Sequence, residues 1–335
     1  MAPENLLLGV VIAGLTLYAV LGGADFGAGV WEFNTAMLAT PKERKLIYHA
    51  IGPVWEANHV WLIFVIVVLF SAFPPALAAL SQALWIPLLL ALVGIVFRGV
   101  GFVFRSYGEG DPRRQATWGA VFALASTAAP FFLGASVGAI AEGRLRVTAN
   151  GDFEGDYLTD WLGPLPIYCG FMVVGQCAYL AAVFLTREAS LERESELVEL
   201  WRRRAIGVGL AMGVLAVVGL MVMVVDAPPL WAGFRARAWP LFGSSVATGL
   251  GSLAALVWRR YHIAVVGAAS TVAAVVWGWL VAQYPLLVPP TISLESARAP
   301  DNVLWAFLIA IAAGTALLAP SLGLLFYLFK THRLD

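Results

Sequence analysis

The stretch IGPVWEANHVWLIFVIVVLFSAF (residues 51–73) places an acid and an imidazole at the start of a long apolar run. From Val60 to Phe70 every residue is apolar. A helix that crosses a bilayer needs about 20 predominantly apolar residues, and this stretch is long enough to form one. Glu56 and His59 are three positions apart, so they would share one face of that helix.

The composition of the whole chain indicates a membrane protein. Of its 335 residues, 60% are hydrophobic and 13% are charged, which is more apolar surface than a soluble domain buries. The apolar runs are continuous, whereas a membrane β-barrel shows short alternating segments. The formal net charge is zero, which argues against a nucleic-acid partner. We therefore expect an all-α polytopic membrane protein with a single integral membrane domain over residues 1–335.

Nine apolar segments are long enough to span a bilayer. They lie at about 6–30, 50–73, 77–104, 116–140, 161–186, 205–225, 240–258, 262–282 and 303–329. Helices 1–4 then occupy about 6–140, helices 5–8 about 161–282, and helix 9 about 303–329. We expect two four-helix bundles and one peripheral helix.

The basic residues predict the orientation. Fifteen of the 21 Lys and Arg residues fall in the first, third, fifth and seventh loops and the C-terminal tail, and five fall on the opposite side. Cytoplasmic loops carry an excess of Lys and Arg. The N-terminus is therefore expected outside and the C-terminus in the cytoplasm.

Three of the loops are long enough to have structure of their own. Residues 141–160 (AEGRLRVTANGDFEGDYLTD) are acidic and rich in turn formers, as expected of a solvated connection. Residues 186–204 (TREASLERESELVELWRRR) carry charges at helical spacing and predict a surface helix before helix 6. Residues 283–300 are rich in proline and predict an ordered cap on the outer side.

Four ionisable residues lie inside the first three predicted helices: Asp25, Glu56, His59 and Arg98. An ionisable side chain at the centre of a bilayer costs at least about 2.5–3.5 kcal/mol, so each one is a functional hypothesis. The alternating directions of the three helices place all four in the cytoplasmic half of the membrane, because helices rise about 1.5 Å per residue.

This alignment in depth suggests a proton path that opens to the cytoplasm and ends at His59. Gly23 and Gly27, four positions apart, would let a neighbouring helix approach Asp25 closely. We expect Trp55, Asn58 and Trp61 to tie helices together. A purely structural interpretation remains open, in which Arg98 is the ion-pair partner that makes a buried acid tolerable.

Two metal-centred interpretations of His59 are disfavoured. The Glu56-x-x-His59 spacing matches di-iron bundles, but those need a second copy and two further glutamates. A haem ligand is conceivable, with Met212, Met221 or Met223 opposite, yet the other histidines lie at membrane edges or in the tail. We expect no metal and no cofactor on this chain.

Five motifs carry a resemblance to a known family. GGADFGAG (22–29), IGPVWEANHVWLIF (51–64), FSAFP (70–74) and FRGVGFVFR (97–105) follow in order, and WGWLVAQYPLLVPPTISLESARAP (277–300) comes near the end. The chain resembles subunit II of the cytochrome bd quinol oxidases. In the bacterial plasma membrane, such a subunit supports a haem-carrying subunit I, sometimes with small accessory subunits and bound lipid or quinone.

The resemblance implies a function for the complex rather than for this chain alone. The complex oxidises quinol and reduces dioxygen to water, with haems b and d, or b only, on subunit I. In the family, the acids of the first two motifs and the first arginine of FRGVGFVFR line a proposed proton path. Those roles fall here on Asp25, Glu56 and Arg98.

The sequence departs from the family at a few positions near this path. The family often has an aspartate where this chain has Gly22, an aspartate-glycine pair in place of Glu56-Ala57, an acid or amide in place of His59, and an acid near Val103. The rival hypothesis is a proton-coupled secondary transporter or a proton-conducting protein, since intramembrane acids with a histidine also serve transport.

Overall fold

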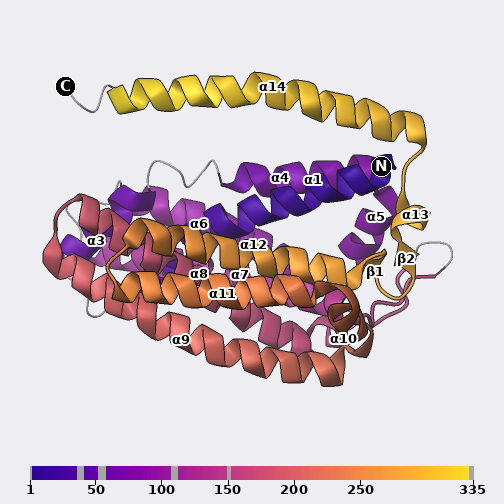
Figure 1. Cartoon of the computed structure of the whole chain (residues 1–335), viewed down its shortest axis with the longest axis horizontal. Coiled ribbons are helices and arrows are strands. Elements are labelled where there is room, and N and C mark those ends of the chain that lie inside the picture. The colour runs from indigo at the N-terminus through magenta and orange to yellow at the C-terminus, as the bar shows by residue number, and fades with distance from the viewer. Residues whose placement is uncertain (1, 36–40, 52–57, 107–111, 149–151, 332–335) are drawn as a thin grey trace.

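The computed structural model describes residues 2–35, 41–51, 58–106, 112–148 and 152–331. Almost all of them are helical (Figure 1), so the all-α prediction is confirmed. The elements are α1 (Pro3–Leu17), the π-helix η1 (Tyr18–Gly22), α2 (Gly23–Thr35), α3 (Pro41–Ile51), α4 (His59–Ala72), α5 (Pro74–Ala83), α6 (Trp85–Ser106), α7 (Pro112–Glu142), the 3₁₀ turn η2 (Thr159–Trp161), α8 (Pro164–Leu191), α9 (Ser195–Asp226), α10 (Pro228–Gly233), the π-helix η3 (Phe234–Ala238), α11 (Trp239–Val257), α12 (Tyr261–Gln283), α13 (Leu294–Ala297) and α14 (Asp301–Thr331).

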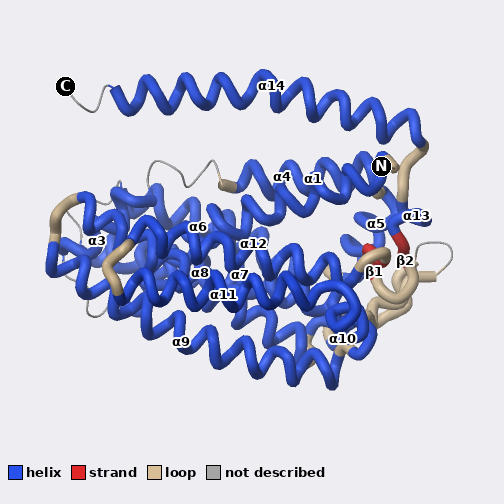
Figure 2. The backbone as a smooth tube through the Cα atoms, in the orientation of Figure 1, coloured by secondary structure: helices blue, strands red, loops and turns tan. Residues whose placement is uncertain are grey.

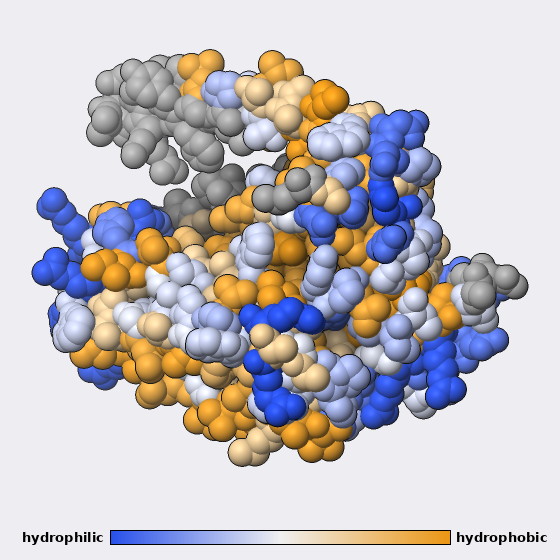
Figure 3. Space-filling view, turned by 45° about the vertical axis from the view of Figure 1, so that its right-hand side comes forward, coloured by the Kyte–Doolittle hydropathy of each residue, from blue (hydrophilic) through white to orange (hydrophobic). Residues whose placement is uncertain are grey.

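Eight helical segments in the described part of the chain are long and apolar enough to cross a membrane. The first is continuous from Pro3 to Glu32, because η1 joins α1 to α2 without a break. The shorter apolar helix α4 (His59–Ala72) corresponds to the second predicted span. In Figure 3 apolar side chains cover much of the visible face, and hydrophilic ones lie at its left and right edges and in a patch near its centre.

The third predicted span, 77–104, is wrong in its first part. The chain forms two helices there, α5 and α6, with a break at Leu84. The physical reason is Pro87, which in one continuous helix would lack the N–H that bonds to the carbonyl of Ala83 and would clash with it. Restarting the helix at Trp85 puts Pro87 in the first turn, where a missing N–H is tolerated.

The separate surface helix predicted for residues 186–204 is also wrong. Helix α8 continues to Leu191, and α9 begins at Ser195 and runs without interruption to Asp226. Arg193 takes a positive φ of 59° in the turn between them. The charged residues therefore extend two long membrane helices beyond the apolar region.

The long helices pack side by side, with α7 and α8 in the interior of the bundle. Helix α7 contacts α6, α8 and α2, while α8 also contacts α9 and α12. Helix α14 lies along one side and reaches the rest through α1 and α4 (Figure 1). This peripheral position agrees with the expected ninth helix.

One end of the bundle is closed by the predicted cap. Strands β1 (Leu286–Val288) and β2 (Ile292–Ser293) pair antiparallel, and α13 follows directly (Figure 2). The backbone N–H of Ala299 donates to the carbonyl of Ala72, at 2.9 Å, which ties the cap to the end of α4. Arg298 pairs with Glu4 of α1 at 3.6 Å.

The opposite end collects most of the arginines, and we call it the basic end. There α3, the C-terminal end of α8, the N-terminal end of α9 and the α11–α12 turn meet. Lys42 pairs with Glu194, and Arg187 donates to His262 across the helices. The sequence predicts that the basic end faces the cytoplasm.

Candidate functional site

The candidate site is a buried polar cluster where α2, α4, α6, α7 and α8 approach one another. Glycines on α2 permit this approach. A Cβ atom on Gly27 would meet the carbonyl oxygen of Cys177 on α8, and one on Gly23 would lie 3.0 Å from Leu180. A Cβ atom on Gly29 would meet Ser126 of α7. The helix therefore packs backbone to backbone with α8 at the level of Asp25.

Asp25 and Arg98 form an ion pair at the centre of this cluster. The Nη2 atom of Arg98 lies 2.5 Å from Oδ1 of Asp25, and their side chains are 1% and 2% exposed. The same nitrogen lies 3.4 Å from the backbone carbonyl of Asp25. A buried charge is tolerated when it is paired and hydrogen-bonded, and this pair meets that condition.

Other side chains hold the Arg98 guanidinium in position. Its Nε–H donates to the hydroxyl of Ser126, at 3.1 Å. Its Cζ atom lies 5.0 Å from the ring centroid of Phe26 and 5.2 Å from that of Phe122. The ring faces attract the cation, so the arginine is held by one carboxylate, one hydroxyl and two aromatic rings.

His59 lies beside this pair, next to two aromatic rings of the cluster. Its ring centroid is 5.7 Å from that of Phe26 and 6.0 Å from that of Tyr18. The Phe26 ring therefore contacts both His59 and Arg98. Tyr18 is the first residue of the π-helix η1, a local widening of the helix that is frequent at functional sites.

Three buried polar atoms of this cluster have no hydrogen-bond partner among the described residues. They are the hydroxyl of Tyr18, Oδ2 of Asp25 and Nδ1 of His59. Leaving a buried polar atom unsatisfied costs about 1–3 kcal/mol. Such atoms are usually satisfied by ordered water when the site has room for it.

The other predicted site residues are distributed as follows. Glu56 and Trp55 lie outside the described residues. Asn58 is buried immediately before α4, with its side chain close to the Asp25 carboxylate. Trp61 packs in the same apolar cluster as Tyr18 and Phe26.

The structure also describes two positions where this chain departs from the resembled family, Gly22 and Val103. Gly22 is buried against the Tyr18 ring, which a Cβ atom would approach to 3.2 Å. Val103 is 38% exposed on α6. An acid at Val103 would thus lie on the exposed side of the helix.

Sequence reasoning missed several members of the cluster. Ser126, Phe26 and Phe122 contact the arginine. Nothing in the sequence distinguishes them from the other serines and phenylalanines of apolar helices. Glu32, a further buried acid, is 6% exposed and lies seven residues after Asp25 on α2. Two helical turns, about 10 Å, separate the two acids, and Glu32 lies on the side of the basic end.

A second ion pair, whose acid is buried, lies at the basic end. Arg204 of α9 donates to Glu43 of α3 at 2.8 Å, and the glutamate side chain is 4% exposed. The Arg204 guanidinium lies 4.6 Å from the Trp201 ring centroid and 5.4 Å from that of Trp31. This arrangement joins α3 to α9 and α2.

Acidic side chains also occur at the other end of the bundle. A cavity of about 430 Å³ there is lined by Gly143, Arg144, Arg146, Glu154, Gly155, Asp160 and Pro290. Burial raises the pKa of Asp160, whereas hydrogen bonds from the backbone N–H groups of Leu158 and Thr159 lower the pKa of Asp156. Among the residues that the structure describes, no three His, Cys, Asp or Glu side chains gather as metal ligands.

The sequence profile of the family described as cytochrome bd terminal oxidase subunit II matches residues 3–329. The chain belongs to this family. The earlier resemblance is thereby confirmed over nearly the whole sequence.

Curated relatives agree with the assignment. The chain is 29% identical to cytochrome bd-I ubiquinol oxidase subunit 2 of Escherichia coli (strain K12) over 187 residues, which are 54% of this chain and 46% of that protein. It is 30% identical to cytochrome bd ubiquinol oxidase subunit 2 of Bacillus subtilis (strain 168) over 183 residues, 54% of this chain and 51% of that one. The matched region thus spans about half the length of these relatives.

A solved structure has the same fold. A chain of the bd oxidase from Geobacillus thermodenitrificans superimposes with a TM-score of 0.77 and 23% sequence identity. The match covers 98% of this chain and 99% of that one. The two chains therefore share one helical fold over nearly their whole lengths.

Proposed function

We propose that this chain is the non-haem subunit of a bd-type quinol:oxygen oxidoreductase in a bacterial plasma membrane. It supports a haem-carrying subunit I and provides a proton-uptake path from the cytoplasm. The observation that carries the proposal is the buried Asp25–Arg98 pair, set in a chain whose family profile matches residues 3–329. Catalysis belongs to the complex, which oxidises quinol and reduces dioxygen to water, and this chain is inactive alone.

The path runs along α2 and then toward α4. Glu32 receives protons near the basic end, and Asp25 lies two turns further in. Glu56, which lies outside the described residues, is included because it comes three positions before His59 in the sequence. His59 lies beyond the Phe26 ring. Proton transfer over such gaps needs water, and the unpartnered atoms of Asp25, His59 and Tyr18 supply sites to bind it.

Arg98 tunes this path rather than carrying the proton. A guanidinium remains charged under all ordinary conditions, so it acts as a fixed positive charge beside Asp25. Because Arg98 also binds Ser126 and two aromatic rings, it stays in place whether or not the carboxyl is ionised. The carboxyl can then accept and release a proton while its neighbours keep their arrangement.

The subunit assignment is tested by co-purification. The chain is purified from the native membrane with its associated proteins, and the reduced-minus-oxidised spectrum and quinol-driven oxygen consumption are recorded. We expect a haem-bearing partner and oxygen consumption. A preparation with neither haem nor oxygen consumption would contradict the assignment.

The path is tested separately with conservative substitutions. Asp25→Asn and Glu56→Gln remove an ionisable proton and keep the side-chain shape. We expect each to slow oxygen reduction while the haem content of the complex stays unchanged. Unchanged turnover would assign these acids a structural role only, and lost haem would assign them to assembly.

A further inference from the structure

Three arginines at the basic end converge on a single carboxylate. Glu199 of α9 accepts from both Nε and Nη2 of Arg202, at 3.0 and 2.8 Å, and from Nε of Arg203, at 2.9 Å. The Nη2 atom of Arg259, in the turn between α11 and α12, lies 3.6 Å from Glu199 Oε2. The exposed Arg260 follows in the same turn. One carboxylate therefore balances only part of the positive charge gathered here.

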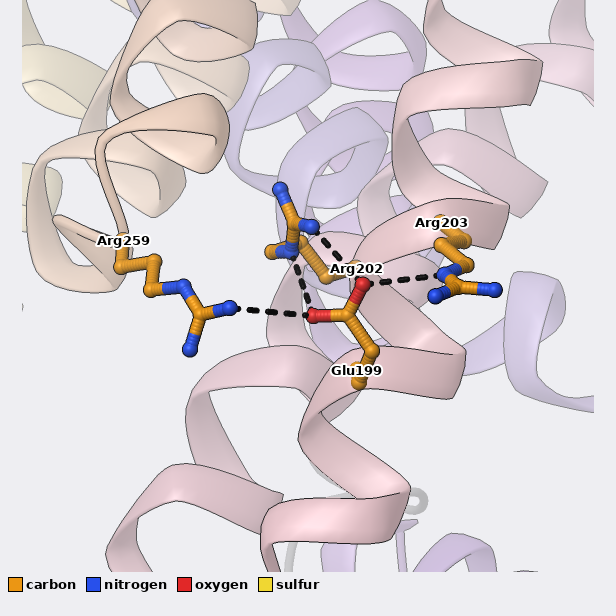
Figure 4. A network of polar contacts seen from close by, with 4 residues as sticks. All are labelled: Glu199, Arg202, Arg203 and Arg259. Carbon is orange, nitrogen blue, oxygen red and sulfur yellow. Dashed lines mark hydrogen bonds and ion pairs between the residues drawn. The ribbon is translucent and has the colours of Figure 1, made fainter.

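The arrangement leaves two guanidinium groups oriented toward Glu199 and still accessible. Figure 4 shows Arg203 and Arg259 reaching Glu199 from different sides, each through one nitrogen. The side chains of Arg203 and Arg259 are 77% and 67% exposed, compared with 17% for Arg202. A guanidinium that is already oriented loses less entropy when it binds an anion, and its planar fork suits phosphate oxygens.

The arginines and the neighbouring acids occupy different depths. The acids Glu188, Glu192, Glu194 and Glu196 belong to the tip formed by the end of α8 and the start of α9. Arg203 lies about 10 Å further along α9 than Glu196, at 1.5 Å per residue. The apolar part of α9 begins directly after Arg204. The arginines therefore stand at the boundary of the hydrocarbon region, where lipid phosphates lie.

Exposed apolar side chains continue from this boundary along both helices. Leu210 and Val214 of α9 are 60% and 67% exposed, and Leu250 and Val257 of α11 are 63% and 56% exposed. A Cβ atom on Gly209 of α9 would meet Leu253 of α11, so the two helices run side by side here.

The α11–α12 turn also carries an aromatic residue at the same level. Trp258, next to Arg259, is 74% exposed. Tryptophan is enriched where membrane helices reach the headgroup region, because its ring is apolar and its N–H is polar. Its position supports the assignment of this level to the lipid headgroups.

We propose that this surface binds one anionic phospholipid. The phosphate lies on Arg203 and Arg259, and the acyl chains run along the exposed faces of α9 and α11. A neutral lipid would satisfy the apolar faces and leave the surplus positive charge unbalanced. An acidic soluble peptide would balance the charge and leave the apolar faces uncovered. An anionic lipid matches both features.

The test compares lipid retention in two charge-matched double variants. The complete complex is placed in nanodiscs of equal parts phosphatidylglycerol and phosphatidylcholine, and bound lipids are counted by native mass spectrometry. The site variant is Arg203→Gln/Arg259→Gln, and the control is Arg146→Gln/Arg235→Gln at the opposite end. Because each basic residue near an anionic surface contributes about a fivefold gain in affinity, we expect phosphatidylglycerol to bind roughly thirtyfold more weakly to the site variant.

Two outcomes of this comparison overturn the proposal. One is equal phosphatidylglycerol retention in the wild-type complex and the site variant. The other is an equal loss in the control, which would show a response to net charge alone. If the site variant does not assemble with its partner, the single variant Arg259→Gln replaces it, with an expected loss of about fivefold.

Photo-crosslinking locates the bound lipid independently. A phosphatidylglycerol with a photoactivatable acyl chain is incorporated into the wild-type complex, and the labelled peptides are identified. We expect labels within 206–217 and 246–258. Labels confined to other segments, or transfer of the label to a protein partner covering this face, would overturn the proposal.

Discussion

Nη2 of Arg98 lies 2.5 Å from Oδ1 of Asp25, joining α6 to α2 through two side chains that are 1% and 2% exposed. Removing water from two charges costs several kcal/mol per ion, and their mutual attraction offsets that cost only in good geometry. Ser126, Phe26 and Phe122 complete that geometry here. Loss of Arg98 therefore leaves the buried Asp25 carboxylate without a counter-charge, whereas loss of the Asp25 charge leaves Arg98 with Ser126 and two aromatic rings.

Arg98→Gln should therefore destabilise the complex more than the double variant Asp25→Asn/Arg98→Gln, which removes both charges. The single variant leaves the Asp25 carboxylate buried without a counter-charge, and we expect about 3–5 kcal/mol of destabilisation. The double variant Asp25→Asn/Arg98→Gln should recover at least half of that loss. Thermal unfolding of the detergent-solubilised complex measures both, and additive losses would contradict the coupling.

The close approach of α2 and α8 predicts that a methyl group added at Gly27 destabilises the protein, whereas one added at Gly213 does not. Gly27→Ala places a methyl group against the Cys177 carbonyl oxygen and Ala181, and overpacking of this kind costs about 1–3 kcal/mol. Gly213→Ala on α9 is the matched control, because nothing lies within 4 Å of its added Cβ atom. We expect that control to be neutral or up to about 1 kcal/mol more stable. Similar melting temperatures for the two variants would contradict the tight packing.

Much of the fold could be predicted because membrane helices are encoded by long local patterns. The apolar runs predict the spans, and the proline-rich segment 283–300 predicts the cap that β1, β2 and α13 form. The break at Leu84 was missed, although Pro87 carried the signal, because the apolar run continues through it. The junction of the charged segment with α9 was missed because helical periodicity does not reveal where a helix leaves the membrane.

The candidate site could be predicted only in part, because the sequence marks its ionisable residues but not the residues that contact them. An ionisable residue inside an apolar run is conspicuous, so Asp25, His59 and Arg98 were identified. The partners Ser126, Phe26 and Phe122 are ordinary residues of membrane helices, and only the three-dimensional packing brings them to Arg98. Glu32 was overlooked because it lies near the end of its helix, where an acid is unremarkable in sequence.

Arg204 pairs with Glu43 and also lies over the Trp201 ring. A positive charge at position 204 without the planar guanidinium should therefore not restore full stability. Arg204→Lys keeps the charge but loses the planar group that stacks on Trp201, 4.6 Å away. We expect a loss of about 1–2 kcal/mol in the free energy of unfolding. Arg203→Lys is the control, since its side chain is 77% exposed, and it should change stability by less than about 0.5 kcal/mol. Equal effects in thermal unfolding would argue against the stacking.

The direction of proton uptake can be tested with two buried acids at opposite ends of the bundle. Glu32, on the side of the basic end, is 6% exposed, and Glu142, at the other end, is 5% exposed and pairs with Arg144 at 3.0 Å. Because Glu32 stands two turns before Asp25 on the proposed path, Glu32→Gln should lower oxygen reduction by roughly tenfold and increase its solvent deuterium isotope effect. Glu142→Gln removes a buried carboxylate of similar exposure outside the path, so turnover should stay within about twofold of the wild type. Equal losses in both variants, with haem content intact, would show that buried acids act here through stability and not through proton entry at the basic end.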